Sequence, residues 1–139
     1  MEAPPLLVQL LAGNAVTAAL VLACINTADA TVLRRLHPAL VVAVAAVPWA
    51  DAKTRVHDTA RWRAALPVAT ALKLAAEALR LHRDRALVAL GGVTELNLAS
   101  CYGVTDAVIA RLPPLLRVLN VAECMLTDEV SFVHLPALE

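Results

Sequence analysis

Apolar residues in the C-terminal half of the chain recur with a spacing of 23 or 24 residues. Leu72, Leu96 and Leu119 each begin a short run in which apolar and polar residues alternate. Alternation over so few positions predicts a β-strand, with the apolar side chains of each run on one face. The sequence therefore predicts three similar short strands, one in each copy of a repeat.

Each predicted strand is followed by signals for a turn and, in the clearest copy, a short helix. There, Thr105 and Asp106 are residues that commonly cap a helix N-terminus, and residues 107–112 place apolar side chains along one helical face. Pro113 and Pro114 then end the helix and direct the chain to the next strand. Because a unit of this size cannot bury its own apolar faces, the copies are expected to stack on one another.

The N-terminal part of the chain has a different pattern. Residues 4–36 show little alternation and predict three short helices, with a break at Gly13 and Asn14. A weaker copy of the repeat predicts another strand at Val42 and Val44, followed by a long connection over residues 48–66. We therefore expect a helical N-terminal cap at residues 1–36 and stacked units at 37–139, which are expected to continue beyond the C-terminus.

Two consecutive segments, VTELNLASCYGVTDAVIARL at 93–112 and LLRVLNVAECMLTDEV at 115–130, place a cysteine and a Thr-Asp pair after the strand. They resemble the cysteine-containing leucine-rich repeats of F-box substrate adaptors, whose pattern is roughly L-x-x-L-x-L-x-x-C-x-x-I-T-D-x-x-L-x-x-L. Cys101 and Cys124 occupy the cysteine position, whereas Glu77 occupies it in the preceding copy. The resemblance implies an α/β fold: a leucine-rich repeat solenoid with parallel β-strands on the concave face and short helices outside.

The same resemblance implies a non-enzymatic role in protein–protein interaction, without a cofactor, through the concave face. The side chains at outward strand positions are the expected contact residues: Lys73, Glu95, Asn97 and Asn120, with Arg117 nearby. Alanine replacement of Asn97 and Asn120 is expected to weaken partner binding with little change in thermal stability. An F-box-like helical segment at 1–36 would make the protein a substrate-recognition adaptor of a ubiquitin ligase, and this alternative stays open.

Apolar residues make up 60% of the chain and charged residues 17%, so much apolar surface is expected to be covered by a partner or to lie in a membrane. The run at 6–25 is long enough to span a bilayer as a helix, but it contains Gln9 and Asn14 and follows the acidic Glu2. We therefore expect a cytoplasmic protein, with membrane association through residues 6–25 as an alternative. If the chain ended at Glu139, its exposed last unit would predict a homo-oligomer.

Charge and cysteine content narrow the expected chemistry. Twelve Lys and Arg balance twelve Asp and Glu, which gives no general attraction to nucleic acid. The three cysteines lack the spacing of a zinc site, and none of the four histidines has a fixed relation to Cys101 that would make it a catalytic base. No catalytic or metal site is therefore predicted. Stacking would bring Cys101 and Cys124 close enough for a disulfide, but two reduced, buried thiols are the preferred interpretation.

One segment mixes cations with aromatic side chains. Residues 49–63 contain four Lys and Arg side chains together with Trp49 and Trp62, a combination that could bind an anionic ligand or a single-stranded nucleic acid. Asp51 and Asp58 interrupt the positive charge, and no series of alternating aromatics follows. The preferred interpretation is a polar helix face whose tryptophan packs on the sheet.

Overall fold

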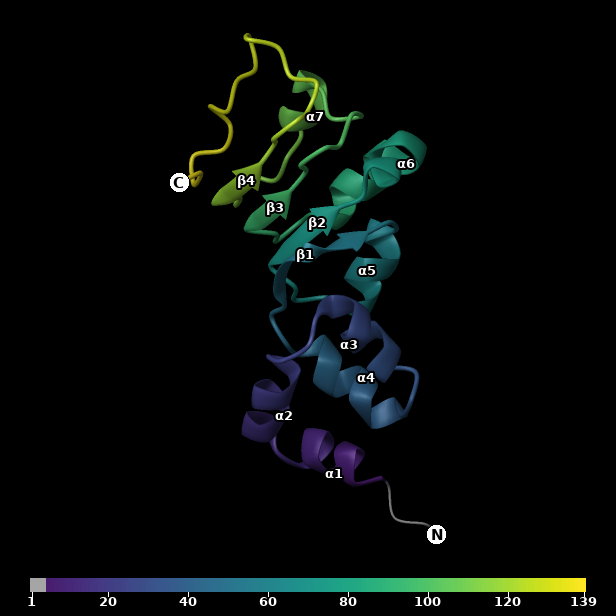
Figure 1. Ribbon diagram of the computed structural model, residues 1–139. Helices are drawn as coiled ribbons and strands as arrows, with labels where there is room; N and C mark the ends of the chain where they lie inside the picture. Colours follow the sequence, from purple (N-terminus) through teal and green to yellow (C-terminus); the bar gives the residue numbers. More distant parts are fainter. Residues whose placement is uncertain (1–4) are drawn as a thin grey trace.

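Strands and helices alternate along the second half of the chain, after a run of short helices at the N-terminus (Figure 1). The computed structural model describes residues 5–139, apart from the side chains of residues 12, 81 and 82. In chain order the elements are α1 (Leu6–Gly13), α2 (Ala15–Leu22), α3 (Thr27–Leu33), α4 (Pro38–Ala45), β1 (Ala50–Val56), α5 (Thr59–Ala65), β2 (Ala71–Leu74), α6 (Ala76–Ala89), β3 (Glu95–Asn97), α7 (Asp106–Ile109) and β4 (Val118–Asn120).

Asparagine side chains explain where two of the N-terminal helices begin. The Oδ1 of Asn14 accepts the N–H groups of Val16 and Thr17 at the start of α2. The Oδ1 of Asn26 accepts the N–H of Asp29 at the start of α3. These bonds satisfy backbone donors that have no partner within the helix. The three short helices expected before Leu36 are present as α1, α2 and α3.

Helix α4 corrects the expectation of a strand at Val42 and Val44. The helix has a proline at its first position, and His37 caps it by accepting the N–H of Ala39 at Nδ1. Leu40 and Val44, four residues apart, are both fully buried, as on one face of a helix. The strand prediction was wrong because valines among alanines leave no polar face that would distinguish a strand from a helix.

A four-stranded parallel sheet forms the centre of the fold, in the order β1-β2-β3-β4. Leu72, Leu96 and Leu119 are Cα partners across β2, β3 and β4, so the three strands predicted from the repeat are present and in register. Helices α5, α6 and α7 connect successive strands and lie on one side of the sheet (Figure 1). The protein therefore has a mixed α/β fold.

Strand β1 lies in a segment for which the sequence indicated a polar helix face. Ala50 pairs with Ala71 and Arg55 pairs with Lys73, so β1 uses more residues than β2 over the same stretch of the ladder. Such an irregularity, or β-bulge, breaks the alternation of inward and outward side chains. The helix face predicted for this segment is found only in its second part, as α5.

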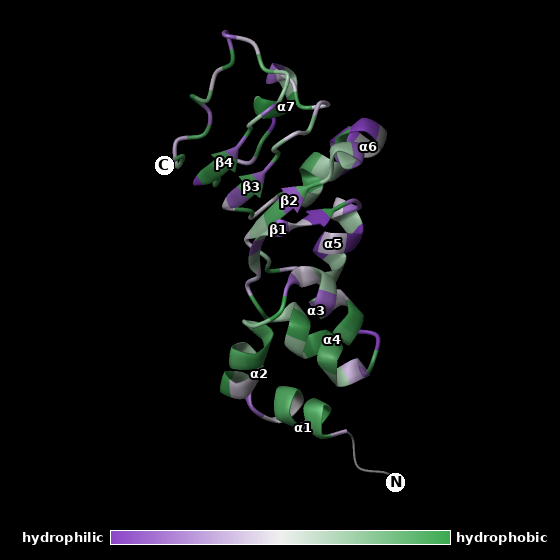
Figure 2. Ribbon diagram, in the orientation of Figure 1, coloured by the Kyte–Doolittle hydropathy of each residue, from purple (hydrophilic) through white to green (hydrophobic). Residues whose placement is uncertain are grey.

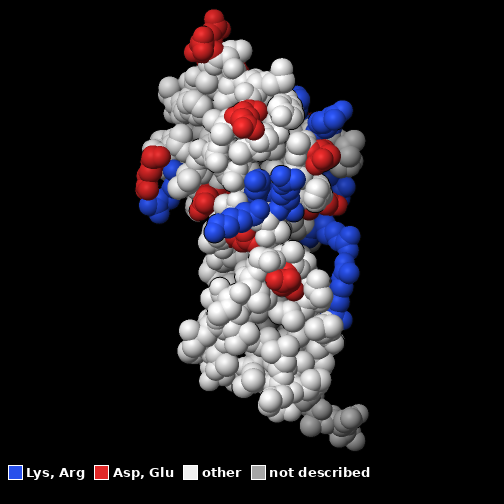
Figure 3. Space-filling view, in the orientation of Figure 1, with Lys and Arg blue, Asp and Glu red and all other residues white. Residues whose placement is uncertain are grey.

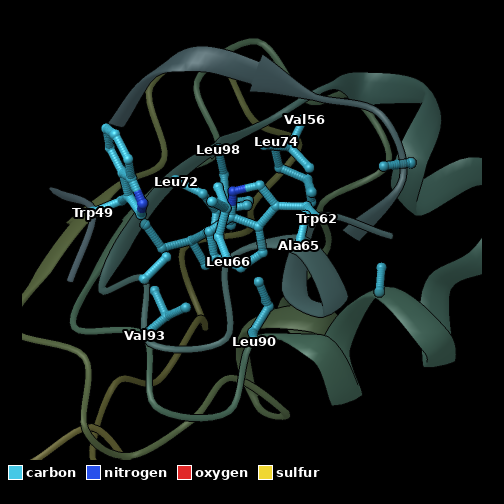
Figure 4. Close-up of a cluster of buried hydrophobic side chains, with 14 of the residues drawn as sticks. Trp49, Val56, Trp62, Ala65, Leu66, Leu72, Leu74, Leu90, Val93 and Leu98 are labelled. Atoms are coloured by element: carbon cyan, nitrogen blue, oxygen red, sulfur yellow. The ribbon is translucent and has the colours of Figure 1, made fainter. Parts of the chain in front are cut away.

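Leucines and two tryptophans fill the space between the sheet and the helices (Figure 4). Trp62 of α5 is 6% exposed and lies among Leu66 and Leu72, which confirms that this tryptophan packs on the sheet. Trp49 is also buried, and its indole Nε1 donates to the carbonyl of Val44 at 2.9 Å. Trp49 thus joins α4 to the start of the sheet.

Most residues of α1, α2 and α4 are hydrophobic (Figure 2), and several of the apolar side chains of α1 and α2 are exposed. Leu6, Val16 and Leu20 are 71%, 70% and 67% exposed. Within residues 5–139, no helix is both long enough and apolar enough to cross a membrane. These helices therefore carry exposed apolar surface without forming a transmembrane span.

Candidate binding surface on the sheet

The face of the sheet that points away from α5, α6 and α7, here called the outer face, carries most of the residues predicted to contact a partner. Along β3, Leu96 is fully buried, whereas Glu95 and Asn97 on either side of it are partly exposed. Lys73, Asn97 and Asn120 are Cα partners across β2, β3 and β4 and form one row. The fold thus brings Lys73, Glu95, Asn97 and Asn120 onto one surface.

On this surface, the side chains of Lys73 and Glu95 have no interaction partner among the described residues. Both are partly exposed. Within the part of the chain that the structure describes, neither side chain makes a hydrogen bond or an ion pair. Their charges are therefore free to interact with another molecule.

Asn97 and Asn120 belong to the row of outward side chains, and each also forms a hydrogen bond with the backbone that follows its strand. The Oδ1 of Asn97 accepts the N–H of Ala99, and the Oδ1 of Asn120 accepts the N–H of Ala122, both at 3.0 Å. Bonds of this kind form Asx turns, which fix the direction of the chain as it leaves a strand. We therefore expect alanine at these positions to lower stability as well, which differs from the expectation formed on the sequence.

Arg117 lies just before β4, and its side chain is paired with another residue of the chain. Its Nε donates to Oε1 of Glu139 at 2.9 Å, and the N–H of Glu139 donates to the carbonyl of Arg117 at 2.8 Å. The guanidinium group of Arg117 is thus held by the side-chain carboxylate of Glu139. Arg117 is a less accessible contact residue than Lys73 or Glu95.

A groove of about 610 Å³ borders the outer face, beside the turn that follows α2. Glu95 and Asn97 line this groove together with Asp51 and Lys53. The amide Nδ2 of Asn97 donates to the carbonyl of Ala52 at 3.3 Å, which links β3 to β1 there. The sequence did not place Asp51 and Lys53 beside Glu95 and Asn97, because the irregular strand β1 that carries them was not predicted.

The two repeat cysteines bond in the same way to the strand before their own. The Sγ of Cys101 donates to the carbonyl of Leu74 at 3.4 Å, and the Sγ of Cys124 donates to that of Leu98 at 3.2 Å. Both are free thiols. Burial raises the pKa of Cys101 to about 11 and also raises the pKa of Cys124. A thiol that stays protonated at neutral pH is a poor nucleophile.

Alkylation with iodoacetamide at about pH 8 is expected to distinguish the cysteines, because only the thiolate reacts. Exposed Cys24 is expected to be fully modified while Cys101, which is 1% exposed, remains almost unmodified. Peptide mass spectrometry measures each site. In denaturant the three cysteines should react at similar rates, whereas a Cys101 that reacts as fast as Cys24 in the folded protein would contradict its burial.

The histidines whose side chains the structure describes are engaged in local contacts. The Nε2 of His134 lies 2.7 Å from a backbone carbonyl of α7, and the Nδ1 of His57 lies 3.7 Å from Oε2 of Glu77. His37 caps α4, and the side chain of His82 lies outside the described residues. Over the described residues, no group of three or more His, Cys, Asp and Glu is arranged to hold a metal ion.

Comparison with known proteins found no match: no protein-family model, no curated protein and no solved structure corresponds to this chain. The function of the outer face is therefore inferred from its own residues.

Proposed function

We propose that the chain is a leucine-rich repeat protein of the cysteine-containing kind and that its outer face binds another protein. The observation that carries this proposal is the row of outward side chains across β2, β3 and β4. Lys73 in this row and Glu95 next to it have charged side chains without a partner among the described residues. Strands in register repeat their side chains at about 4.8 Å, which suits contact with an extended protein surface.

Details that recur between the units of β3 and β4 support a repeat protein. Ser100 and Glu123 follow the two strands at equivalent positions, and both have left-handed backbone, with φ of 63° and 58°. Such a conformation is uncommon for residues other than glycine. The Asp106 carboxylate accepts hydrogen bonds from the backbone and hydroxyl of Thr127, which is the equivalent of Thr105 in the next unit. The two units therefore follow similar backbone paths through the turn after each strand and are bonded to each other, although a helix follows β3 and none is described after β4.

Exchanging the two free charges tests the proposal without changing the net charge. The Lys73→Glu/Glu95→Lys variant and the wild-type protein are used to capture partners from an extract of the cells that make the protein, with recovery measured by quantitative mass spectrometry. The matched control is Arg83→Glu/Glu129→Lys, which exchanges two exposed charges away from the outer face.

We expect the outer-face variant to recover at least about tenfold less of a partner protein than the wild type does, because the reversed charges would face like charges on that partner. The control variant should recover that protein as the wild type does. Equal recovery by the outer-face variant would show that this surface is not the contact. Urea unfolding of both variants establishes that they are folded.

The exposed apolar side chains of the N-terminal helices favour a second contact surface, which a ubiquitin-ligase adaptor would require. The Val16→Gln/Leu20→Gln variant removes part of this surface, and Val133→Gln, at an exposed site after β4, is the control. Ligase scaffold subunits that the wild type and the control capture, and the first variant does not, would support the adaptor function. Their absence from the wild-type capture would remove it.

A further inference from the structure

A cleft of about 590 Å³ lies between α3, β1 and α5 and shares no lining residue with the groove beside the outer face. Four arginines line it: Arg34 and Arg35 at the end of α3, Arg55 in β1 and Arg61 in α5. Figure 3 shows Lys and Arg side chains gathered across the middle of the molecule, above N-terminal helices that carry few charges. The chain has twelve Lys and Arg residues and zero net charge. Four of these twelve residues therefore line a single cleft.

The positive charge of the cleft is only partly balanced, because four arginines and one carboxylate are among its described lining residues. None of the ion pairs that the structure describes includes any of these four arginines. Asp58 is the one carboxylate among the described lining residues, and its Oδ1 accepts the N–H of Arg61 at 2.9 Å to cap α5. Guanidinium groups without a counter-charge repel one another, so an anion in the cleft would lower the electrostatic energy.

Two buried donors in the lining, the Nε of Arg34 and the indole Nε1 of Trp62, also lack a partner among the described residues. The Nε of Arg34 is inaccessible to solvent and makes no hydrogen bond among the described residues. Buried N–H groups are nearly always hydrogen-bonded in folded proteins, and an unpaired one calls for an explanation. The fork of N–H donors on arginine matches the oxygens of a phosphate group particularly well.

Besides the arginines, the cleft is lined by both polar and apolar side chains, among them three threonines and His57. Val41, Val56 and Ala65 supply an apolar part of the wall. A cavity of this volume with apolar walls and a few polar groups is typical of sites for small molecules. The wall would accommodate the carbon part of a ligand whose anionic group meets the arginines.

The two tryptophans argue against single-stranded nucleic acid as the occupant. Proteins that bind single strands stack the bases on exposed aromatic rings. Trp49 and Trp62 are both buried in the core, where they pack against the sheet and the helices. Neither offers a free ring face to a base.

We propose that this cleft binds a small organic phosphate, with the phosphate held by the arginines and the carbon part on the apolar wall. The site is separate from the outer face and does not depend on the protein-binding function. Phenyl phosphate is a suitable probe because it combines one phosphate with one apolar ring. Inorganic phosphate tests the contribution of the anion alone, and benzoate tests whether a carboxylate is sufficient.

Isothermal titration calorimetry on the whole chain measures binding of the three probes. We expect phenyl phosphate to bind at least about tenfold more tightly than inorganic phosphate or benzoate, because only phenyl phosphate uses both parts of the cleft. No detectable binding of phenyl phosphate would overturn the proposal. Inorganic phosphate binding as tightly would reduce the site to a general anion patch, and benzoate binding as tightly would refute the assignment to phosphate.

Variants locate the binding in the cleft. Arg55→Met and Arg61→Met, at two exposed lining positions, are each expected to weaken phenyl phosphate binding by about tenfold or more. Arg83→Met on α6 removes an exposed arginine outside the cleft and should leave the affinity unchanged. Urea unfolding shows whether each variant is folded. Retained affinity in folded Arg55→Met and Arg61→Met would place the ligand elsewhere and refute the site.

Discussion

Replacing Arg63 with methionine is expected to lower the free energy of unfolding by about 3 kcal/mol. The guanidinium group of Arg63 donates to the carbonyls of Ala89 and Gly91 at the end of α6. It also donates to the carbonyls of Pro67 and Ala69 in the segment that leads into β2. Methionine keeps much of the apolar stem but leaves these carbonyls without their charged donor. Urea unfolding followed by circular dichroism measures the loss.

The four bonds depend on the shape of the guanidinium group as well as its charge. Lysine at position 63 carries the same charge but cannot reach four carbonyls at once, so Arg63→Lys should recover only a small part of the lost stability. Arg83→Met, which removes an exposed arginine from α6, should change stability by less than about 0.5 kcal/mol. Equal stability of Arg63→Met and Arg83→Met would contradict this role for Arg63.

Replacing Asp51 with asparagine is expected to lower the free energy of unfolding by about 2 kcal/mol at pH 7. The Oδ2 of Asp51 accepts the N–H and the hydroxyl of buried Thr27 at the start of α3, each at 2.9 Å. The Oδ1 accepts the N–H groups of Lys53 and Thr54 within β1, each at 3.0 Å. An asparagine would present an NH₂ group to one of these pairs of donors. One connection between the N-terminal helices and the sheet would therefore be broken.

The stability lost in the Asp51→Asn variant should become smaller as the pH is lowered. Partial burial raises the pKa of Asp51, but the hydrogen bonds from Thr27, Thr54 and Lys53 outweigh it and hold that pKa well below its usual range. Because the folded pKa lies below the unfolded one, the contribution of Asp51 is complete above about pH 5 and is lost as the pH falls below about 4. The stability gap between wild type and Asp51→Asn should narrow over that range.

Urea unfolding at a series of pH values between about 7 and 2.5 measures this gap, over the range in which carboxylates titrate. Asp128→Asn, at an exposed aspartate after β4, serves as the control for a general effect of lost charge. A gap between wild type and Asp51→Asn that stays constant down to the lowest pH would show that the Asp51 charge contributes nothing to the link between Thr27 and β1.

The sequence was sufficient for the part of the fold in which periodicity is regular. Leu96 alternates with Glu95 and Asn97, and the same alternation recurs after 23 or 24 residues, so strand position, burial and register all followed from the pattern. Both repeat cysteines were expected to be buried, because they recur at a fixed distance from the strand; Cys101 is buried, whereas Cys124 is only partly buried. Such signals are local and repeated.

The sequence was insufficient where one pattern fits two structures or where the pattern is broken. Val42 and Val44 lie in a run of valine and alanine that suits a strand or a helix equally, and the packing of Leu40 with Val44 on a common face decides for α4. Strand β1 contains Asp51 and Lys53 within an irregular pairing, so its side chains do not alternate. The cations of residues 49–63 were recognised as a possible site for an anionic ligand, but the pattern gave no sign that Arg34 and Arg35 after α3 join Arg55 and Arg61 at one cleft, or that Glu95 and Lys53 line one groove.

The candidate contact residues could be predicted by position but not by availability. Alternation along β3 identified Glu95 and Asn97 as outward side chains. It gave no sign that the amide of Asn97 donates to the carbonyl of Ala52 in β1. Hydrogen bonds between a side chain and the backbone of another strand depend on the assembled sheet, which a single strand pattern does not contain.

Photo-cross-linking from the outer face tests the proposed function most directly. A benzoyl-phenylalanine residue is introduced in place of Glu95, and in a second variant in place of exposed Glu129 as the control. After irradiation in the cells that make the protein, we expect a discrete cross-linked partner from position 95 and none from position 129. No adduct from position 95, or the same adducts from both positions, would contradict a binding role for the outer face.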